Sequence, residues 1–129
     1  MSSQSNPKPG LEFLASLDPI AAENLERFRK ISPELVDGFI TRLYGEIYQR
    51  DRLSRRERFL VTIAGLMASA HVDAQLAMQA RLALKNGLTR EELMEVALQI
   101  SIFSGYGNAI NAIAIIDGVA DQVELESDP

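Results

Sequence analysis

The 129-residue sequence contains no cysteine and only one histidine, His71. Without cysteine there is no disulfide bond, no thiolate nucleophile and no cysteine-based redox chemistry. One histidine among scattered carboxylates does not provide ligands with the spacing of a metal site, so we expect neither a metal nor another cofactor. The sequence also contains no glycine-rich loop of the phosphate-binding type.

The sequence likewise lacks long apolar runs and an excess of positive charge. No apolar stretch is long enough to cross a bilayer, and the polar N-terminus has no apolar signal core, so we expect a cytoplasmic protein. The net charge of −5 argues against a nucleic-acid partner. Arg55, Arg56 and Arg58 do cluster, but one short group of this kind is typical of a solvated face.

The remaining sequence is dominated by helical periodicity. No segment alternates apolar and polar residues with the period of two that a half-buried strand requires. We therefore predict an all-α fold of about six helices. The expected organisation is a flexible arm over 1–10, a single all-helical domain over 11–123 and an acidic tail over 124–129.

Two short helices are predicted in the first third of the chain. Asp18 followed by Pro19, and Ser32 followed by Pro33, each combine a capping side chain with a proline at the first helical position. The first of these helices should end near Lys30. It should bury Ala21, Leu25 and Phe28. The second carries a broad apolar stripe of Leu35, Phe39, Leu43 and Ile47, flanked by Val36, Ile40 and Tyr44.

The central part, 54–112, begins with a capping box of Ser54 and Glu57. The helix that follows is apolar on most sides, which is typical of a helix in a core or a subunit interface. Gly87 marks a helix end, and Thr89 and Glu92 form a second capping box. The helices on either side of Gly87 have apolar stripes of Val72, Leu76, Ala80 and Ala83, and of Leu93, Val96, Ala97, Ile100 and Phe103.

The last predicted helix runs from about 108 to 121 and is apolar on more than one face. Helices with two apolar faces are abundant for so small a chain, so we expect a homo-oligomer whose interface resembles an opened core. The alternative is a compact six-helix bundle that hides both faces internally.

Three segments together resemble the carboxymuconolactone decarboxylase family, which also contains the alkylhydroperoxidase D-like proteins: LSRRERFLVTIAGL, AQLAMQARLALKNGLTREELMEV and FSGYGNAINA. The positions that match the family pattern are Arg56, Arg58, Ala83, Leu84, Gly87, Thr89, Glu91, Glu92, Glu95, Gly105, Ala109 and Ala112. The resemblance covers about 53–117. It implies an alkylhydroperoxidase D-like helical bundle that forms trimers or hexamers, with its site near a subunit boundary.

The chain departs from the family where reactive groups are expected. Alignment of the motifs places Val72 and Gln75 at the two cysteines of the peroxidase-type members, Gln79 at their histidine and Phe59 at their glutamate. The decarboxylase-type members lack the cysteines but usually keep the histidine. Glutamine forms hydrogen bonds but does not titrate. The resemblance therefore implies a decarboxylase-like protein rather than a thiol peroxidase.

His71 is the candidate for proton transfer, because histidine titrates near neutrality. The alternative is a histidine that joins two helices and interacts with the negative end of the first. Gln75 and Gln79 lie one turn apart and could line a pocket, or could form an ordinary polar boundary. Arg56 or Arg58 could orient an anionic substrate.

Three further residues are substrate-binding candidates. Glu95 lies beyond the first turn of its helix, so helix capping does not explain it. Tyr106 and Asn108, in a turn with two glycines, could present a hydroxyl and an amide to a ligand. For Asn108 we favour the alternative that it caps the last helix.

The function predicted from these residues is acid/base or lyase chemistry on a small organic acid, such as a lactone that carries a carboxylate. The alternative is a non-catalytic oligomeric binding protein that kept the scaffold and lost the reactive groups. An enclosed pocket that contains both His71 and Gln79 would favour the enzyme. A histidine directed into bulk water would favour the binding protein.

Overall fold

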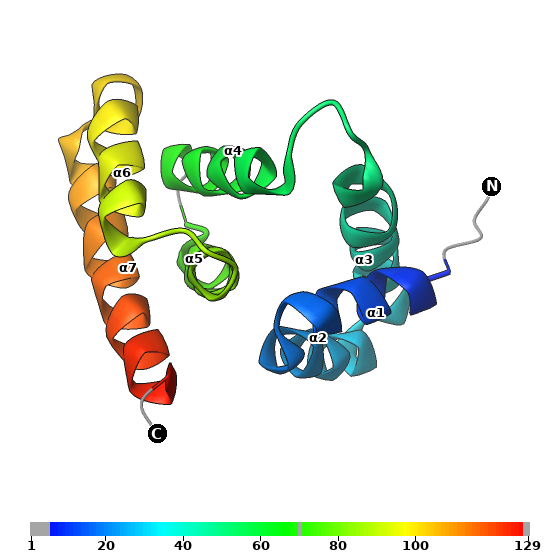
Figure 1. Cartoon of the computed structure of the whole chain (residues 1–129). Coiled ribbons are helices and arrows are strands. Elements are labelled where there is room, and N and C mark those ends of the chain that lie inside the picture. The colour runs from blue at the N-terminus through cyan, green and yellow to red at the C-terminus, as the bar shows by residue number, and fades with distance from the viewer. Residues whose placement is uncertain (1–5, 70, 128–129) are drawn as a thin grey trace. The chain divides into compact units, whose positions relative to one another are not determined.

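The computed structural model describes residues 6–69 and 71–127. These residues form seven α-helices, one π-helical turn and one 3-10 turn, with no strand, which confirms the predicted all-α class (Figure 1). The chain divides at the Leu53–Ser54 bond into two compact units. A single domain over 11–123 stays a prediction.

The first unit begins with α1, Lys8–Leu17. This helix starts inside the predicted arm, of which residues 1–5 lie outside the described part of the chain. Pro7 and Pro9 do not prevent the helix, because the first amides of a helix have no intrahelical partner and proline lacks only that amide. Pro7 at the N-cap and Pro9 in the first turn are therefore compatible with the start of α1.

Helix α2, Pro19–Ile31, has the predicted cap. The Asp18 carboxylate accepts a hydrogen bond from the backbone N–H of Ile20 at 3.2 Å, and Asp18 is almost completely buried. Ala21 and Leu25 are buried as predicted, but 41% of Phe28 is exposed. Phe28 lies seven residues after Ala21 and so on nearly the same face, but this end of α2 is only partly covered.

Helix α3, Pro33–Ile40, continues into the π-helical turn η1, Thr41–Glu46, and the 3-10 turn η2, Ile47–Gln49. The predicted apolar stripe is wrong by one position, because the residues predicted to flank it form the buried face. The buried positions are Val36, Ile40, Tyr44 and Tyr48. Positions four apart drift around a regular α-helix. A wider π turn offsets this drift and keeps the two tyrosines on the buried face.

Helix α1 crosses η1 very closely at a pair of glycines. A Cβ atom on Gly10 would lie 2.6 Å from the backbone oxygen of Ile40 and 3.2 Å from the backbone nitrogen of Gly45. Tyr44 and Tyr48 stack beside the crossing, with ring centroids 5.6 Å apart. The first unit therefore depends on a glycine contact that the sequence pattern does not reveal.

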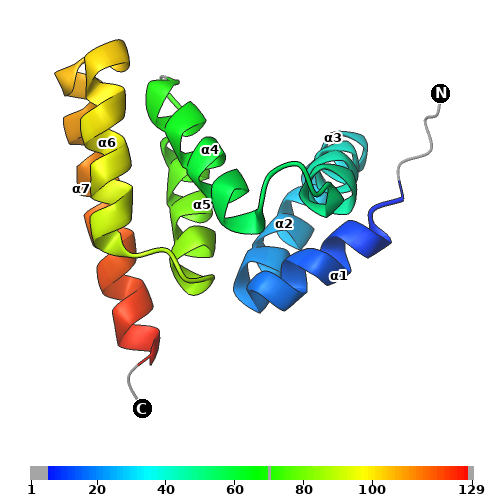
Figure 2. The ribbon, with the colours of Figure 1, turned by 45° about the horizontal axis from the view of Figure 1, so that its top comes forward.

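The second unit contains α4 (Arg55–Ala68), α5 (Asp73–Lys85), α6 (Arg90–Ser104) and α7 (Tyr106–Ser127). Both predicted capping boxes are present, Ser54 with Glu57 and Thr89 with Glu92. Gly87 has a φ of 104°, which confirms the predicted left-handed helix end. Figure 2 shows α6 and α7 side by side, and both α5 and α6 contact α7.

Small side chains make up most of the buried positions of α6 and α7. The buried residues of α6 are Leu93, Ala97 and Ser101, and those of α7 are Ala109, Ala112, Ile116 and Ala120. Phe103 was predicted to belong to the buried stripe of α6, but 83% of its surface is exposed. The stripe instead follows intervals of four from Leu93 to Ser101, which leaves Phe103 on the outer face.

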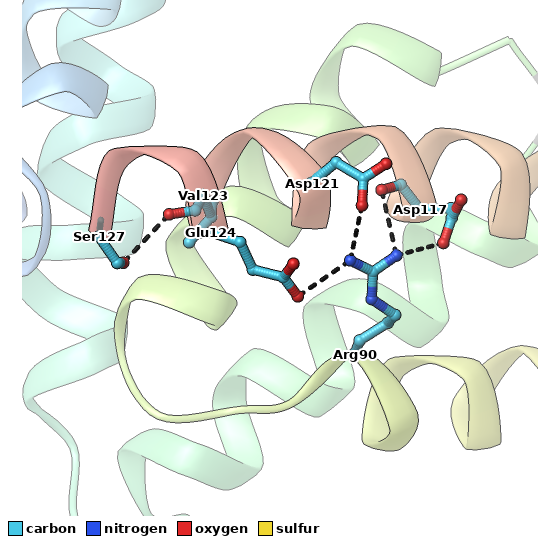
Figure 3. A network of polar contacts seen from close by, with 6 residues as sticks. All are labelled: Arg90, Asp117, Asp121, Val123, Glu124 and Ser127. Carbon is cyan, nitrogen blue, oxygen red and sulfur yellow. Dashed lines mark hydrogen bonds and ion pairs between the residues drawn. The ribbon is translucent and has the colours of Figure 1, made fainter. Parts of the chain in front are cut away.

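Helix α7 is longer than predicted at both ends, and ion pairs hold its C-terminal half. The Arg90 guanidinium binds Asp117, Asp121 at 2.8 Å and Glu124 at 3.0 Å (Figure 3). The hydrogen bonds to Asp121 and Glu124 raise the pKa of Arg90 above its ordinary value. A second group joins Arg81 to Glu126 through two hydrogen bonds of 2.6 and 2.8 Å. The segment predicted as an acidic tail is therefore helical as far as Ser127.

Candidate functional site

A pocket of about 180 Å³ lies in the second unit where α4 ends, α5 begins and the first turns of α7 pass. We call it the His71 pocket. Its polar lining consists of Ser69, His71, Asp73, Asn108 and Asn111. Its apolar lining consists of Leu66, Met67, Val72, Leu76 and Ala112. The single histidine of the chain therefore lies in the wall of a pocket with polar and apolar sides.

The backbone that presents His71 is unusual. His71 has a φ of 64°, a left-handed conformation that is uncommon for residues other than glycine. Such strain costs on the order of 1–3 kcal/mol and often occurs at functional sites. The residue is exposed and lies in the turn that precedes α5. The strained backbone therefore makes His71 a candidate functional residue independently of its side-chain chemistry.

Helix α5 begins at this pocket without a capping side chain. Its N-cap position is Val72, which makes no side-chain hydrogen bond to the first turn. The first amides of a helix carry a partial positive charge and bind anions when no side chain satisfies them. The pocket thus combines an uncapped helix N-terminus with a group that can transfer protons.

Hydrogen bonds hold four of the five polar side chains. The amide nitrogen Nδ2 of Asn111 donates to Oδ1 of Asp73 at 3.3 Å, which joins α7 to the first turn of α5. Asn108 Nδ2 donates to the carbonyl oxygen of Ser104 at 3.1 Å. The Ser69 hydroxyl donates to the carbonyl oxygen of Gly65 at 2.9 Å.

Asn108 does not cap the last helix, so the favoured prediction for this residue is wrong. Helix α7 begins two residues earlier, at Tyr106, after Gly105 turns the chain with a φ of 94°. Asn108 therefore lies within the first turn. Its side chain bonds back to the end of α6 and lines the His71 pocket.

The two glutamines do not join His71. Gln79 is buried in α5, with only 4% of its surface exposed, and it does not line the His71 pocket. Gln75 is half-buried, and its Nε2 atom lies 3.7 Å from Sδ of Met78. Within a single chain, the pocket that contains His71 therefore does not contain Gln79.

The two candidate arginines are also remote from His71. Arg56 forms an ion pair with Glu92, and Arg58 is half-buried in the first turn of α4. The pocket contacts Leu66, eight residues after Arg58 on the same helix. At 1.5 Å per residue the separation along the helix axis is about 12 Å. Within one chain, neither arginine lines the His71 pocket.

Tyr106 and Glu95 lie elsewhere on α6 and α7. Tyr106 is 69% exposed and borders a second, largely apolar pocket of about 410 Å³ between these helices. This pocket is also lined by Met94, Ala97, Leu98, Ser101, Ala109, Ile110 and Ile113. Glu95 is exposed and lines neither this pocket nor the His71 pocket.

Ser69, Asp73 and Asn111 are the polar pocket residues that the sequence analysis did not single out. One signal for Asn111 was available, because it follows Asn108 by three residues and so shares a face of the last helix. Asp73 follows His71 by two residues and opens the next helix. Their hydrogen bond joins residues 38 positions apart, which periodicity alone does not predict.

A sequence model of the carboxymuconolactone decarboxylase family matches residues 33–118. The chain belongs to this family. The match begins within the first unit, well before the resemblance found from motifs alone.

Curated relatives of this family member include two that are named as decarboxylases. The chain is 37% identical over 83 residues to 4-carboxymuconolactone decarboxylase of Acinetobacter baylyi, an alignment that covers 64% of this chain and 59% of the relative. It is 28% identical over 95 residues to nitrosuccinic acid decarboxylase of Metarhizium robertsii, covering 74% and 64%. An uncharacterized 15.0 kDa protein of Paracoccus denitrificans is 27% identical over 119 residues, covering 91% and 89%. The chain thus spans less than two thirds of either decarboxylase.

Two further properties bear on the class of site. In residues 6–69 and 71–127, no group of three or more histidine, aspartate or glutamate side chains is placed to hold a metal ion. None of the helices in the same residues combines the length and hydropathy needed to cross a membrane.

Proposed function

We propose that this family member is a decarboxylase of a small organic acid and that the His71 pocket is its reaction site. The observation that carries the proposal is the position of His71 in the wall of a pocket at the uncapped N-terminus of α5. The substrate carboxylate would lie against the first amides of α5, where the helix dipole favours an anion. The two relatives named as decarboxylases support the reaction class.

The chemical step needs only one proton-transfer group from the protein. The bond between the carboxylate carbon and its neighbour breaks, CO2 leaves, and the electron pair passes into an adjacent carbonyl or similar acceptor as an enolate. The His71 imidazolium then donates a proton to carbon, which completes the exchange of CO2 for hydrogen. His71 is the one histidine in the pocket lining, and histidine is the residue type that most often acts as a general acid or base.

The test measures CO2 release from 4-carboxymuconolactone and from nitrosuccinate, the acids named for the two relatives. Wild-type protein should release CO2 from a substrate, and His71→Ala should lower kcat by about 10²–10⁴-fold, the usual contribution of general acid–base catalysis. Gln79→Ala serves as a comparison outside the pocket. Unchanged turnover in His71→Ala would remove His71 from the mechanism.

A non-catalytic binding protein is the second candidate. It is favoured by the burial of Gln79, at the family's histidine position, away from the His71 pocket. In that case the wild-type protein would bind small acids, and neither it nor His71→Ala would release CO2.

We also propose that the chain assembles with copies of itself through the outer face of α6 and α7. This face exposes five large side chains by between 64% and 83%: Leu98, Ile102, Phe103, Tyr106 and Ile110. The second pocket lies among them, and its lining is largely apolar. Contiguous apolar surface of this kind marks interaction sites. Light scattering after gel filtration should give a multiple of the 14.2 kDa chain mass, and Ile102→Lys should lower it.

A further inference from the structure

The connection from α5 to α6 contains the one Asn-Gly pair of the sequence, Asn86–Gly87. Glycine after asparagine favours loss of the side-chain amide without an enzyme, because glycine has no side chain to hinder ring closure. The backbone nitrogen of Gly87 attacks Cγ of Asn86, the Cγ–Nδ2 bond breaks, and ammonia leaves with the proton from that nitrogen. Water then opens the cyclic imide at either carbonyl and gives aspartate or isoaspartate. The reaction thus needs no reagent other than water.

The folded end of α5 holds Asn86 in a geometry that opposes this ring closure. The imide ring places the Gly87 nitrogen beside Cβ of Asn86, whereas a ψ of 26° at Asn86 places it beside the backbone nitrogen of the same residue. The side chain is also held in place, because its Nδ2 atom donates to the carbonyl oxygen of Leu82 at 2.7 Å. Ring closure therefore requires rotation of both the side chain and the backbone.

Rotation about the Cα–C bond of Asn86 would disrupt the helix end. The backbone N–H of Leu88 donates to the carbonyl oxygen of Ala83 at 3.1 Å, and together with the left-handed Gly87 this bond closes α5. Leu88 is also buried, with 4% of its surface exposed. Because the rotation moves every atom that follows Asn86, the imide forms when this bond opens and Leu88 leaves its buried position. Local openings of this kind occur at equilibrium in folded proteins.

The products of the reaction do not fit the closed helix end. Aspartate has no N–H to donate, so a carboxylate oxygen would face the carbonyl oxygen of Leu82. Its negative charge would also lie at the C-terminus of α5, where the helix dipole disfavours an anion. Isoaspartate adds a methylene to the backbone, which displaces Leu88 from its hydrogen bond with Ala83.

We infer that Asn86 is a site of spontaneous deamidation, which the folded end of α5 keeps slow and whose products keep that end from closing again. The modification is therefore a one-way step that records how often the connection between α5 and α6 has opened. It does not depend on the reaction proposed for the His71 pocket.

The test compares the full chain folded in buffer with the full chain unfolded in guanidinium chloride, at the same mildly alkaline pH. Trypsin cleaves after Lys85 and Arg90, so residues 86–90 are released as one peptide, and mass spectrometry measures its conversion from amide to acid. A sample digested before incubation corrects for reaction during the digestion. The folded chain should react at a measurable rate that is at least about tenfold lower than that of the unfolded chain.

Two variants separate the chemistry from its consequence. Asn86→Gln keeps an amide but lengthens the side chain, so the ring would be larger and residue 86 should not be converted to an acid within the same period under either condition. Asn86→Asp has the side chain of one product. It should lower the midpoint temperature of unfolding by about 3–8 °C, through the lost hydrogen bond and the added charge.

Asn24→Asp in α2 is the matched control for the added charge. The Oδ1 atom of Asn24 accepts a hydrogen bond from Arg27 at 3.1 Å, and a carboxylate can accept the same bond. This variant should keep the wild-type midpoint temperature within about 2 °C.

Three results would overturn the inference. Equal rates in the folded and unfolded chains would show that the helix end does not control the reaction. No conversion of Asn86 in the unfolded chain would show that the residue is not a deamidation site. An Asn86→Asp variant with the wild-type midpoint temperature would show that the product fits the closed end.

Discussion

Replacement of Gly10 by alanine tests the close crossing of α1 and η1. The added Cβ would lie 2.6 Å from the backbone oxygen and 2.9 Å from Cγ2 of Ile40. A backbone oxygen in a helix cannot move without disturbing its turn, and the side chain of Ile40 is completely buried and β-branched. The two helical segments must therefore move apart.

The expected magnitude follows from two opposing effects. Overpacking of a core contact costs about 1–3 kcal/mol, and alanine in place of glycine in a helix recovers up to about 1 kcal/mol. The difference is about 0–2 kcal/mol. Because the closest clash is with a backbone oxygen, we expect Gly10→Ala to lower the free energy of unfolding by an amount in the upper half of this range, about 1–2 kcal/mol. The matched control is Gly38→Ala in α3, where nothing lies within 4 Å of the added Cβ. It should stabilise by about 0.5–1 kcal/mol.

Urea unfolding provides the assay. Tyrosine fluorescence reports mainly on the first unit, because two of the three tyrosines, Tyr44 and Tyr48, are buried there and the chain has no tryptophan. The third, Tyr106 in α7, is already exposed in the folded chain. For a slope of about 1–3 kcal/mol per molar urea, the midpoints of the two alanine variants should differ by about 1 M. The reasoning is refuted if Gly10→Ala unfolds at the same urea concentration as wild type or a higher one.

Three further predictions concern the second unit. Arg90→Met should speed amide hydrogen exchange between Asp117 and Ser127, and high salt should reduce this difference from wild type, because the ion pairs are exposed. The backbone and side-chain hydrogen bonds with Ser54 lower the pKa of Glu57. The stability that the Glu57 carboxylate contributes is therefore present above the ordinary glutamate pKa and is lost as the pH falls through the lowered value. Glu57→Gln should flatten this part of the pH–stability curve, measured by circular dichroism. His71→Gly should raise the midpoint temperature of unfolding, because glycine adopts a φ of 64° without strain. The same variant should abolish CO2 release. A lower midpoint temperature than wild type would show that the turn is not strained.

The helices with strong start and end signals could be predicted from the sequence. Both capping boxes and the left-handed Gly87 follow from local chemistry within four residues, and the structure contains each of them. The faces of the helices were harder to predict. Periodicity predicts that a helix has an apolar stripe, but it does not determine which apolar residues at the edge of the stripe are buried. Phe103 is an example, because it fits the stripe of α6 and is exposed.

The candidate site was predicted only in part. His71 and Asn108 were singled out from the sequence, and both line one pocket. The pocket also contains a side-chain hydrogen bond from Asn111 to Asp73, and these two residues are distant in sequence. Gln79 was chosen from its position in the family pattern, and the structure buries it. A pattern match assigns a position on a helix, but the neighbouring helices decide whether that position reaches a cavity.

The apolar outer face of α6 and α7 has a consequence for the behaviour of the chain in water. Its exposed side chains include Ile102, Phe103 and Ile110, which lie on two helices in contact with each other. Burial of apolar surface is driven mainly by entropy near 25 °C, so its contribution weakens on cooling. If this face stays uncovered, the chain should aggregate as its concentration rises, and cooling should slow the aggregation.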